Sequence, residues 1–137
     1  MQAFGLNVRT SYRKGVSVAK QYLDLCIMPV PKTKIAAYTK TTKIIGKLLL
    51  KHGALASRDY MADDENASSL SFPKKIKLKK GEVIVVAEAV FKSKAHRDSV
   101  FKKMFKDPKM EQLNMGPEWM DQKRCVVGGF TMIANVE

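Results

Sequence analysis

The chain has 137 residues, 45% of them hydrophobic, which fits one globular domain with a single core. Its 25 Lys and Arg residues outnumber its 13 Asp and Glu residues, and the formal charge of +12 favours polyanionic partners. No apolar run approaches the roughly 20 residues of a membrane-spanning helix, so the sequence indicates no insertion into a membrane.

Residues 1–21 are predicted to form a basic extension in front of the domain, which covers residues 22–137. The extension has no acidic residue and loosely resembles an organelle presequence or an expression leader. It lacks a strong apolar core followed by a small-residue cleavage site, so secretion is not expected. We expect a cytoplasmic protein.

The two cysteines, Cys26 and Cys125, lie in apolar runs, without CxxC spacing or a Cys/His cluster. Free thiols in such runs usually behave as small core hydrophobes, and the spacing indicates neither a zinc site nor a redox pair. We therefore predict no metal site and no cofactor.

Periodicity predicts two main helices and four strands. In one helix the apolar residues at helical spacing, a stripe that His52 continues, end at Gly53. In the other, Ser93 is a plausible N-cap, Phe105 is expected to face inward with its apolar neighbours, and the helix ends before the Asp107–Pro108 turn. The basic stretch 72–81 is predicted to be a solvated approach to the third strand, and 108–113 a short helical turn. In chain order the main elements are a strand at 22–30, a helix at 35–52, strands at 54–62 and 82–91, a helix at 94–106 and a strand at 123–133.

This order favours an α+β sandwich whose four-stranded antiparallel sheet carries both helices on one face. The third strand has one unbroken apolar face, formed by Val83, Val85, Ala87, Ala89 and Phe91. The other sheet face is too apolar to be left to water, since we assign to it Ile84, Val86, Val90, Cys26 and Met28. Pairing of two such faces across a twofold axis is the simplest cover, so a homodimer is expected.

Short motifs between residues 22 and 134 are specific as a set: Pro29-Val30-Pro31, His52-Gly53-Ala54-Leu55, Ser71-Phe72-Pro73, Ser93-Lys94, Arg97-Asp98, Asp107-Pro108-Lys109-Met110, and Lys123-Arg124 leading to Gly128-Gly129-Phe130. With them the chain resembles the YbaA-like proteins, an uncharacterised family of the dimeric α+β barrel superfamily. The resemblance implies a ferredoxin-like βαββαβ half-barrel whose sheet packs on a second copy. It implies no activity, although some members of the wider superfamily are cofactor-independent oxygenases, isomerases or haem enzymes.

Three positions depart from the family pattern. Glu88 stands where the family usually has Trp in the third strand, Phe91-Lys92 replaces a Tyr-Pro pair, and Val127 replaces an aromatic residue before the double glycine. A pocket built on those aromatic side chains is expected to be altered in this chain.

Two adjacent glycines in the last strand form one candidate binding site. Gly128 and Gly129 lie between Val127 and Phe130, where glycine costs about 0.5–1 kcal/mol relative to Ala, so a local feature must compensate. A bulge or tight packing is the favoured explanation, and contact with a ligand is the alternative.

Asp24 and Glu88 are the candidate catalytic residues. If the first strand lies between the third and the fourth, alternation predicts that both carboxylates face the chamber between paired sheets. They would form an acid/base pair there, with at least one raised pKa. The alternative, which burial favours, is ion pairing with Arg58 or Arg124.

Charged positions on the second helix offer two further hypotheses. Arg97 and Asp98 match the family and are candidates for a pocket rim, although Asp98 is also spaced for a surface pair with Lys94 or Lys102. Both helices carry outer lysines that predict a basic surface for nucleic acid, with a merely solvated coat as the alternative: Lys40, Lys43, Lys47, Lys51, Lys102, Lys103, Lys106 and Lys109. The third strand lacks the aromatic residues with which an RNA-recognition domain stacks bases.

The sequence contains no complete catalytic motif and leaves open whether the protein is an enzyme. The expected function is small-molecule binding or cofactor-independent catalysis in a chamber between the sheets of a homodimer. That chamber is expected to be lined by Asp24, Glu88, Arg124 and residues near Gly128. The alternative is a basic nucleic-acid-binding module.

Overall fold

The computed structural model describes residues 20–64, 71–113 and 121–137, so most of the predicted extension at 1–21 lies outside the described residues. One antiparallel sheet has the strand order β2-β3-β1-β4, formed by β1 (Tyr22–Pro31), β2 (Ala56–Met61), β3 (Glu82–Phe91) and β4 (Val126–Thr131). The predicted α+β class and antiparallel sheet are confirmed, and β1 does lie between β3 and β4.

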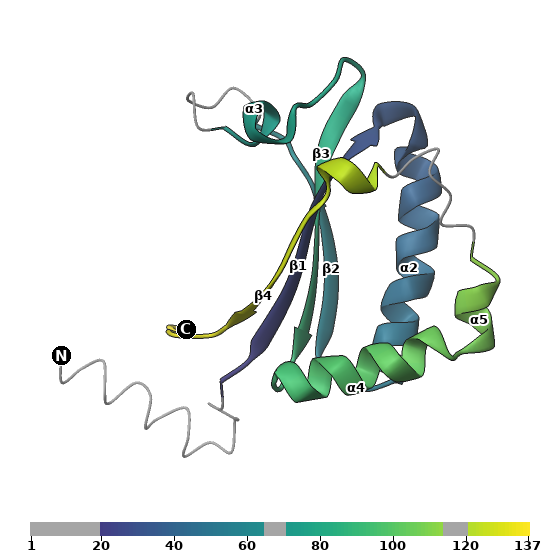
Figure 1. Cartoon of the computed structure of the whole chain (residues 1–137), viewed down its shortest axis with the longest axis vertical. Coiled ribbons are helices and arrows are strands. Elements are labelled where there is room, and N and C mark those ends of the chain that lie inside the picture. Colours follow the sequence, from purple (N-terminus) through teal and green to yellow (C-terminus); the bar gives the residue numbers. More distant parts are fainter. Residues whose placement is uncertain (1–19, 65–70, 114–120) are drawn as a thin grey trace, which may run out of the picture.

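Helices α2 (Ile35–Lys51) and α4 (Lys94–Phe105) lie on one side of the sheet, and α3 (Phe72–Ile76) lies on the other (Figure 1). The short helix α5 (Pro108–Glu111) follows α4, and 3-10 turns precede α2 and β4 as η1 (Lys32–Lys34) and η2 (Gln122–Arg124). The placement of both main helices on one sheet face agrees with the sequence prediction.

Local sequence signals mark where the helices begin and end. Gly53 has a φ of +116°, a left-handed conformation that glycine adopts without strain after the last turn of α2. The Ser93 hydroxyl accepts a hydrogen bond from the His96 N–H at 3.0 Å and caps α4. Asp107 caps α5 in the same way, with its carboxylate accepting from the Lys109 N–H at 3.0 Å.

Three local predictions were wrong. Part of the basic stretch 72–81 folds as α3 and buries Ile76, because its lysines point outward while the isoleucine packs inward. The last strand begins only at Val126, since the η2 turn occupies the preceding residues. Phe105, expected to face inward, has 58% of its surface exposed at the end of α4.

The strand register divides the sheet into two faces. We call the side covered by α2 and α4 the helix face; its β1 and β3 residues are Tyr22, Asp24, Cys26, Met28 and Val30 with Val83, Val85, Ala87, Ala89 and Phe91. We call the other side the open face; its residues include Leu23, Leu25, Ile27, Ala56, Arg58, Tyr60, Val86, Glu88, Val90, Val126, Gly128 and Phe130. Cys26 and Met28 were predicted on the open face. That assignment was wrong, because Cys26 pairs with Ala87 and therefore shares the helix face with it.

The core lies between the helix face and the two helices. Phe91 is fully buried and makes an edge-on contact with the ring of Phe101 on α4, with 5.5 Å between ring centroids. The Tyr38 hydroxyl of α2 donates to the Asp59 carboxylate of β2 at 2.5 Å. Burial is the larger cause and this hydrogen bond the next, and together they raise the pKa of Tyr38 above its ordinary range.

A buried carboxylate joins the end of α2 to the turn between α4 and α5. Asp107 Oδ2 lies 2.8 Å from Nζ of Lys51 and 2.9 Å from Nε2 of His52, and only 4% of the aspartate side chain is exposed. The hydrogen bond from Lys51, then that from His52, holds the pKa of Asp107 well below its usual range. His52, which the sequence placed on the packed side of its helix, thus has a structural partner.

Gly129 is required by the side chain of Tyr22 on the neighbouring strand. Gly129 pairs with Asp24 on the helix face, and the Tyr22 side chain, two residues away from Asp24, occupies the space where a Cβ of residue 129 would lie. A Cβ at this position would stand 2.7 Å from Cζ of Tyr22 and closer still to the hydroxyl. The favoured sequence explanation of the double glycine, tight packing, therefore applies to Gly129.

We predict that Gly129→Ala lowers the free energy of unfolding by about 1–3 kcal/mol, because the added methyl group must displace a packed aromatic ring. Gly128→Ala is the matched control, since its Cβ would meet only the half-exposed ring of Phe130, at 3.0 Å. Urea denaturation of both variants measures the difference. Equal stability of the two variants would contradict the proposed close contact.

We predict that Asp107→Asn lowers the midpoint of thermal unfolding at neutral pH. The decrease of this midpoint as the pH is lowered should be smaller in the variant than in the wild type. A folded-state pKa below the unfolded value of about 3.9 contributes stability that is fully present above that pH. This contribution is lost as the pH falls through the lower, folded-state pKa. Thermal scans across acid pH measure it, with Asp98→Asn, an exposed carboxylate, as the control. Parallel pH profiles of wild type and Asp107→Asn would refute the role.

Candidate functional site

Among the residues that the structure describes, no helix covers the open face over most of its length. The α3 segment lies beside the end of the sheet where β3 begins (Figure 1), and there Pro29 and Ile84 are fully buried. Away from that end, Leu23, Leu25 and Ile27 of β1 are only partly buried. At the edges, Tyr60 on β2 and Phe130 on β4 each leave 51% of their surface exposed. The open face is therefore an apolar surface with one covered end.

One polar cluster interrupts this surface. Glu88 pairs with Leu25 on one side and with Arg58 on the other. Its Oε1 accepts hydrogen bonds from Nη1 of Arg58 at 3.0 Å and from the Tyr60 hydroxyl at 3.2 Å. The Glu88 side chain is 21% exposed, whereas that of Arg58 is 55% exposed. We call Arg58, Tyr60 and Glu88 the open-face triad.

The expected ion pair of Glu88 with Arg58 is thus present. The prediction that Asp24 and Glu88 face the same side of the sheet was wrong. Asp24 pairs with Ala89, so it lies on the helix face while Glu88 lies on the open face. Directly opposed residues of antiparallel strands point to the same face of the sheet, and residues one position further along point to the opposite face. An acid/base pair made of these two carboxylates is therefore excluded.

Asp24 is instead bound by an arginine of α4. Arg97 donates from Nη1 to Asp24 at 2.6 Å and from Nε to Asp98 at 2.7 Å. Its guanidinium lies 5.3 Å from the ring centre of Tyr22 and 5.7 Å from that of Phe101. The bond to Asp98, opposed in part by burial, raises the pKa of Arg97. Asp98 pairs with its neighbour in sequence and not with the expected lysines.

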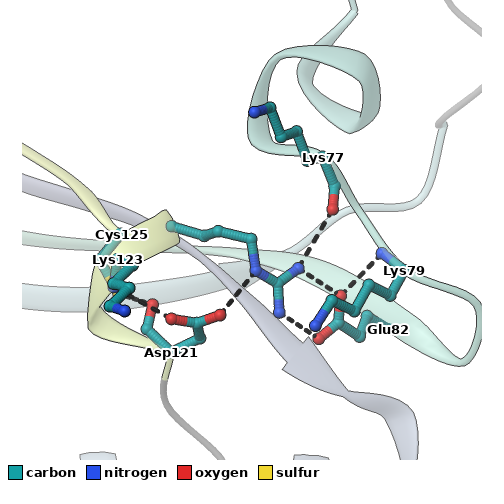
Figure 2. Close-up of polar contacts among 7 residues, drawn as sticks. Lys77, Lys79, Glu82, Asp121, Lys123 and Cys125 are labelled. Atoms are coloured by element: carbon teal, nitrogen blue, oxygen red, sulfur yellow. Dashed lines mark hydrogen bonds and ion pairs between the residues drawn. The ribbon is translucent and has the colours of Figure 1, made fainter.

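Arg124 is the centre of a separate polar network at the covered end (Figure 2). Its Nη1 and Nη2 bind the two oxygens of Glu82 at 2.6 and 2.7 Å, its Nε binds Asp121 at 2.8 Å, and Nη1 also reaches the Lys77 carbonyl at 3.2 Å. These hydrogen bonds hold the pKa values of Glu82 and Asp121 below their usual range and raise that of Arg124. Arg124 therefore joins the α3 segment, β3 and η2.

The two glycines point to different faces. Gly129 contacts Tyr22 on the helix face, whereas Gly128 lies on the open face next to the Phe130 ring. Only Gly128 can contribute to a site formed on the open face.

The lysines predicted to form a basic surface are all exposed: Lys40, Lys43, Lys47, Lys51, Lys102, Lys103, Lys106 and Lys109. Helix α2 contains no acidic residue. Within the part of the chain that the structure describes, only Lys51 of this set is in an ion pair, with Asp107.

Among residues 20–64, 71–113 and 121–137, no three His, Cys, Asp or Glu side chains are grouped closely enough to hold a metal ion. In the same part of the chain, no helix has the length and hydrophobicity to cross a membrane.

Two functionally placed residues were missed by the sequence analysis. Tyr60 lies two residues after Arg58 on β2, and this spacing in a strand indicated that the two side chains share a face. Glu82 gave no such signal, because its partner Arg124 lies far away in the sequence.

Comparisons with known proteins identify a family but no activity. A search of curated proteins found no match. Among solved structures, the de novo designed protein Foldit4 aligns with 85% of this chain and 99% of its own, at 12% identity and a TM-score of 0.39, a likeness too distant to support any inference. The family model for the proteins of unknown function DUF1428 matches residues 21–121. The expectation of an uncharacterised family is confirmed: the chain belongs to the DUF1428 family of proteins of unknown function.

Proposed function

We propose that the protein is a cytoplasmic homodimer of the dimeric α+β barrel type, as its resemblance to YbaA-like proteins implies, and that it binds a small molecule between two paired open faces. One observation carries the proposal. The open-face triad is a hydrogen-bonded polar group within an apolar sheet surface that, among the described residues, only α3 covers, at one end.

The apolar surface is the reason to expect a second copy. Large exposed apolar patches are rare on monomeric proteins and mark interaction sites. A twofold axis lets the same patch serve both subunits, since the surface is then self-complementary. Leu25, directly opposite Glu88, lies close to the middle of the surface that would become buried.

The triad would supply polarity inside the resulting chamber. Arg58 uses only Nη1 in the bond to Glu88, so its other N–H groups can donate to an anionic or carbonyl group of a ligand. Glu88 Oε2 can accept a hydrogen bond from a donor on the same ligand. Since Asp24 lies on the helix face, Glu88 is the one remaining candidate of the two carboxylates for proton transfer.

We predict a dimer in native mass spectrometry of the untagged protein, with retained ligand visible as extra mass. Leu25→Asp should convert it to a monomer, because two added carboxylates would be buried without partners. Leu50→Asp is the matched control, since Leu50 is an exposed leucine on α2 and should leave the dimer intact. A monomeric wild-type protein would refute the paired-face arrangement.

A second candidate function is nucleic-acid binding through the lysines of α2, α4 and α5. It is supported by the exposed lysines that have no carboxylate partner within the described residues, and by the absence of acidic residues from α2. Polyanion binding through such lysines releases counterions and weakens as salt rises.

For this candidate we predict that the triple substitution of Lys40, Lys43 and Lys47 by Gln reduces the slope of log K against log salt by about 3 for duplex DNA. The control is the triple substitution of Lys74, Lys75 and Lys80 by Gln, which removes the same charge around α3. Fluorescence anisotropy at several salt concentrations measures both slopes. An equal change of slope in both variants would show that overall charge, and not the helical surface, determines binding.

A further inference from the structure

The two cysteines, far apart in the sequence, meet where β1 and β4 pair. Cys26 lies opposite Val127 in the register, and Cys125 comes two residues earlier on the same neighbouring segment. Alternation places both on the helix face, and both pack against the cluster of Met28, Val30, Tyr38 and Val85. Both are free and partly buried.

The two thiols are diagonal neighbours on one face of adjoining chain segments, and both pack against the same apolar cluster. Cys125 Sγ donates to the Asp121 carbonyl at 3.3 Å, within the turn shown in Figure 2. The proximity of Cys125 is one of the causes that raise the pKa of Cys26, after burial. The hydrogen of Cys125 is directed at Asp121, so a lone pair of its sulfur remains open toward other neighbours.

We propose that Cys26 and Cys125 form a dithiol site that a peroxide converts into an intramolecular disulfide. The Cys125 thiolate attacks one peroxide oxygen, the O–O bond breaks, and Cys125 becomes a sulfenic acid while the leaving hydroxide takes up the released proton as water. The Cys26 thiolate then attacks the Cys125 sulfur, the S–O bond breaks and a second water leaves. Two thiols are oxidised to one disulfide, and one hydrogen peroxide is reduced to two waters.

The surroundings determine the rate of this reaction. Burial raises the pKa of Cys26 to about 11 and also raises that of Cys125. Thiolate is therefore scarce at neutral pH, and oxidation is slow there and faster at higher pH. Thiols of high pKa are also poor leaving groups, so the disulfide is reduced slowly once formed. The site thus yields a persistent cross-link and not a rapid sensor.

The cross-link would act on the edge of the sheet. Within the described residues, strand β4 is the edge strand and pairs with β1, and nearly all of its residues are exposed. A Cys26–Cys125 bond would anchor the beginning of β4 to β1 and close a loop that spans most of the domain. This inference does not rest on the proposed chamber, since both thiols lie on the helix face.

The test exposes the full, reduced chain to hydrogen peroxide at about pH 7 and about pH 9, followed by intact mass spectrometry and non-reducing peptide mapping. We expect a mass lower by two hydrogen atoms, one peptide joining Cys26 to Cys125, faster formation at the higher pH, and a raised thermal midpoint that dithiothreitol reverses. Cys125→Ser, which keeps a donor for the Asp121 carbonyl, should show no such mass loss. Cys26→Ser provides the same control if the first variant fails to fold.

Three outcomes would overturn the proposal. The first is that both thiols stay reduced after prolonged exposure to peroxide at the higher pH but react with it in denaturant. The second is oxidation of each cysteine separately to a sulfinic acid, without a disulfide between them. The third is that every disulfide found joins two chains. Loss of the dimer, in contrast, would leave the intramolecular cross-link unaffected, so the two proposals fail independently.

Discussion

The antiparallel register of β1 against β3 is the constraint on which the rest of the structure depends. It places Asp24 opposite Ala89 and Leu25 opposite Glu88, and so assigns every β1 side chain to a face. Asp24 consequently meets Arg97 of α4, whereas Glu88 is left on the uncovered side with Arg58. The same register brings Cys26 to the helix face, where it can meet Cys125.

The ion pairs differ in how far burial and additional partners commit their charged groups. Arg124 and Glu82 are mostly buried and bidentate, and Asp107 is almost completely enclosed by its partners. Such groups stabilise only as complete networks, because a single unpaired buried charge is costly. Arg58 differs from Arg97 and Arg124, since 55% of its side chain is exposed against 18% and 14% of theirs, and it bonds through Nη1 to Glu88 within the described residues. That contrast is why the open-face triad is a better candidate for ligand binding than Arg97 or Arg124.

Exposed lysines lie on both sides of the sheet. The helical side carries them on α2, α4 and α5, and α2 has no acidic residue at all. On the other side, Lys74 and Lys75 of α3 are exposed at the covered end, whereas the open-face triad joins one arginine to one glutamate. In the proposed dimer the lysines of α2, α4 and α5 would remain apart, whereas those of α3 would lie on the paired side.

The sequence by itself determined the local elements. Apolar periodicity located α2, β2, β3 and α4, and Gly53 and Ser93 marked helix ends because caps act through neighbouring backbone groups. It also indicated the contact of Arg58 with Glu88 as one of several alternatives. Only the tertiary structure decided which face each strand residue occupies, since alternation is local but register is set by long-range pairing. For the same reason the structure alone revealed the Tyr22–Gly129 contact, the partners of Arg124 and the meeting of the two cysteines, all of which join residues distant in sequence.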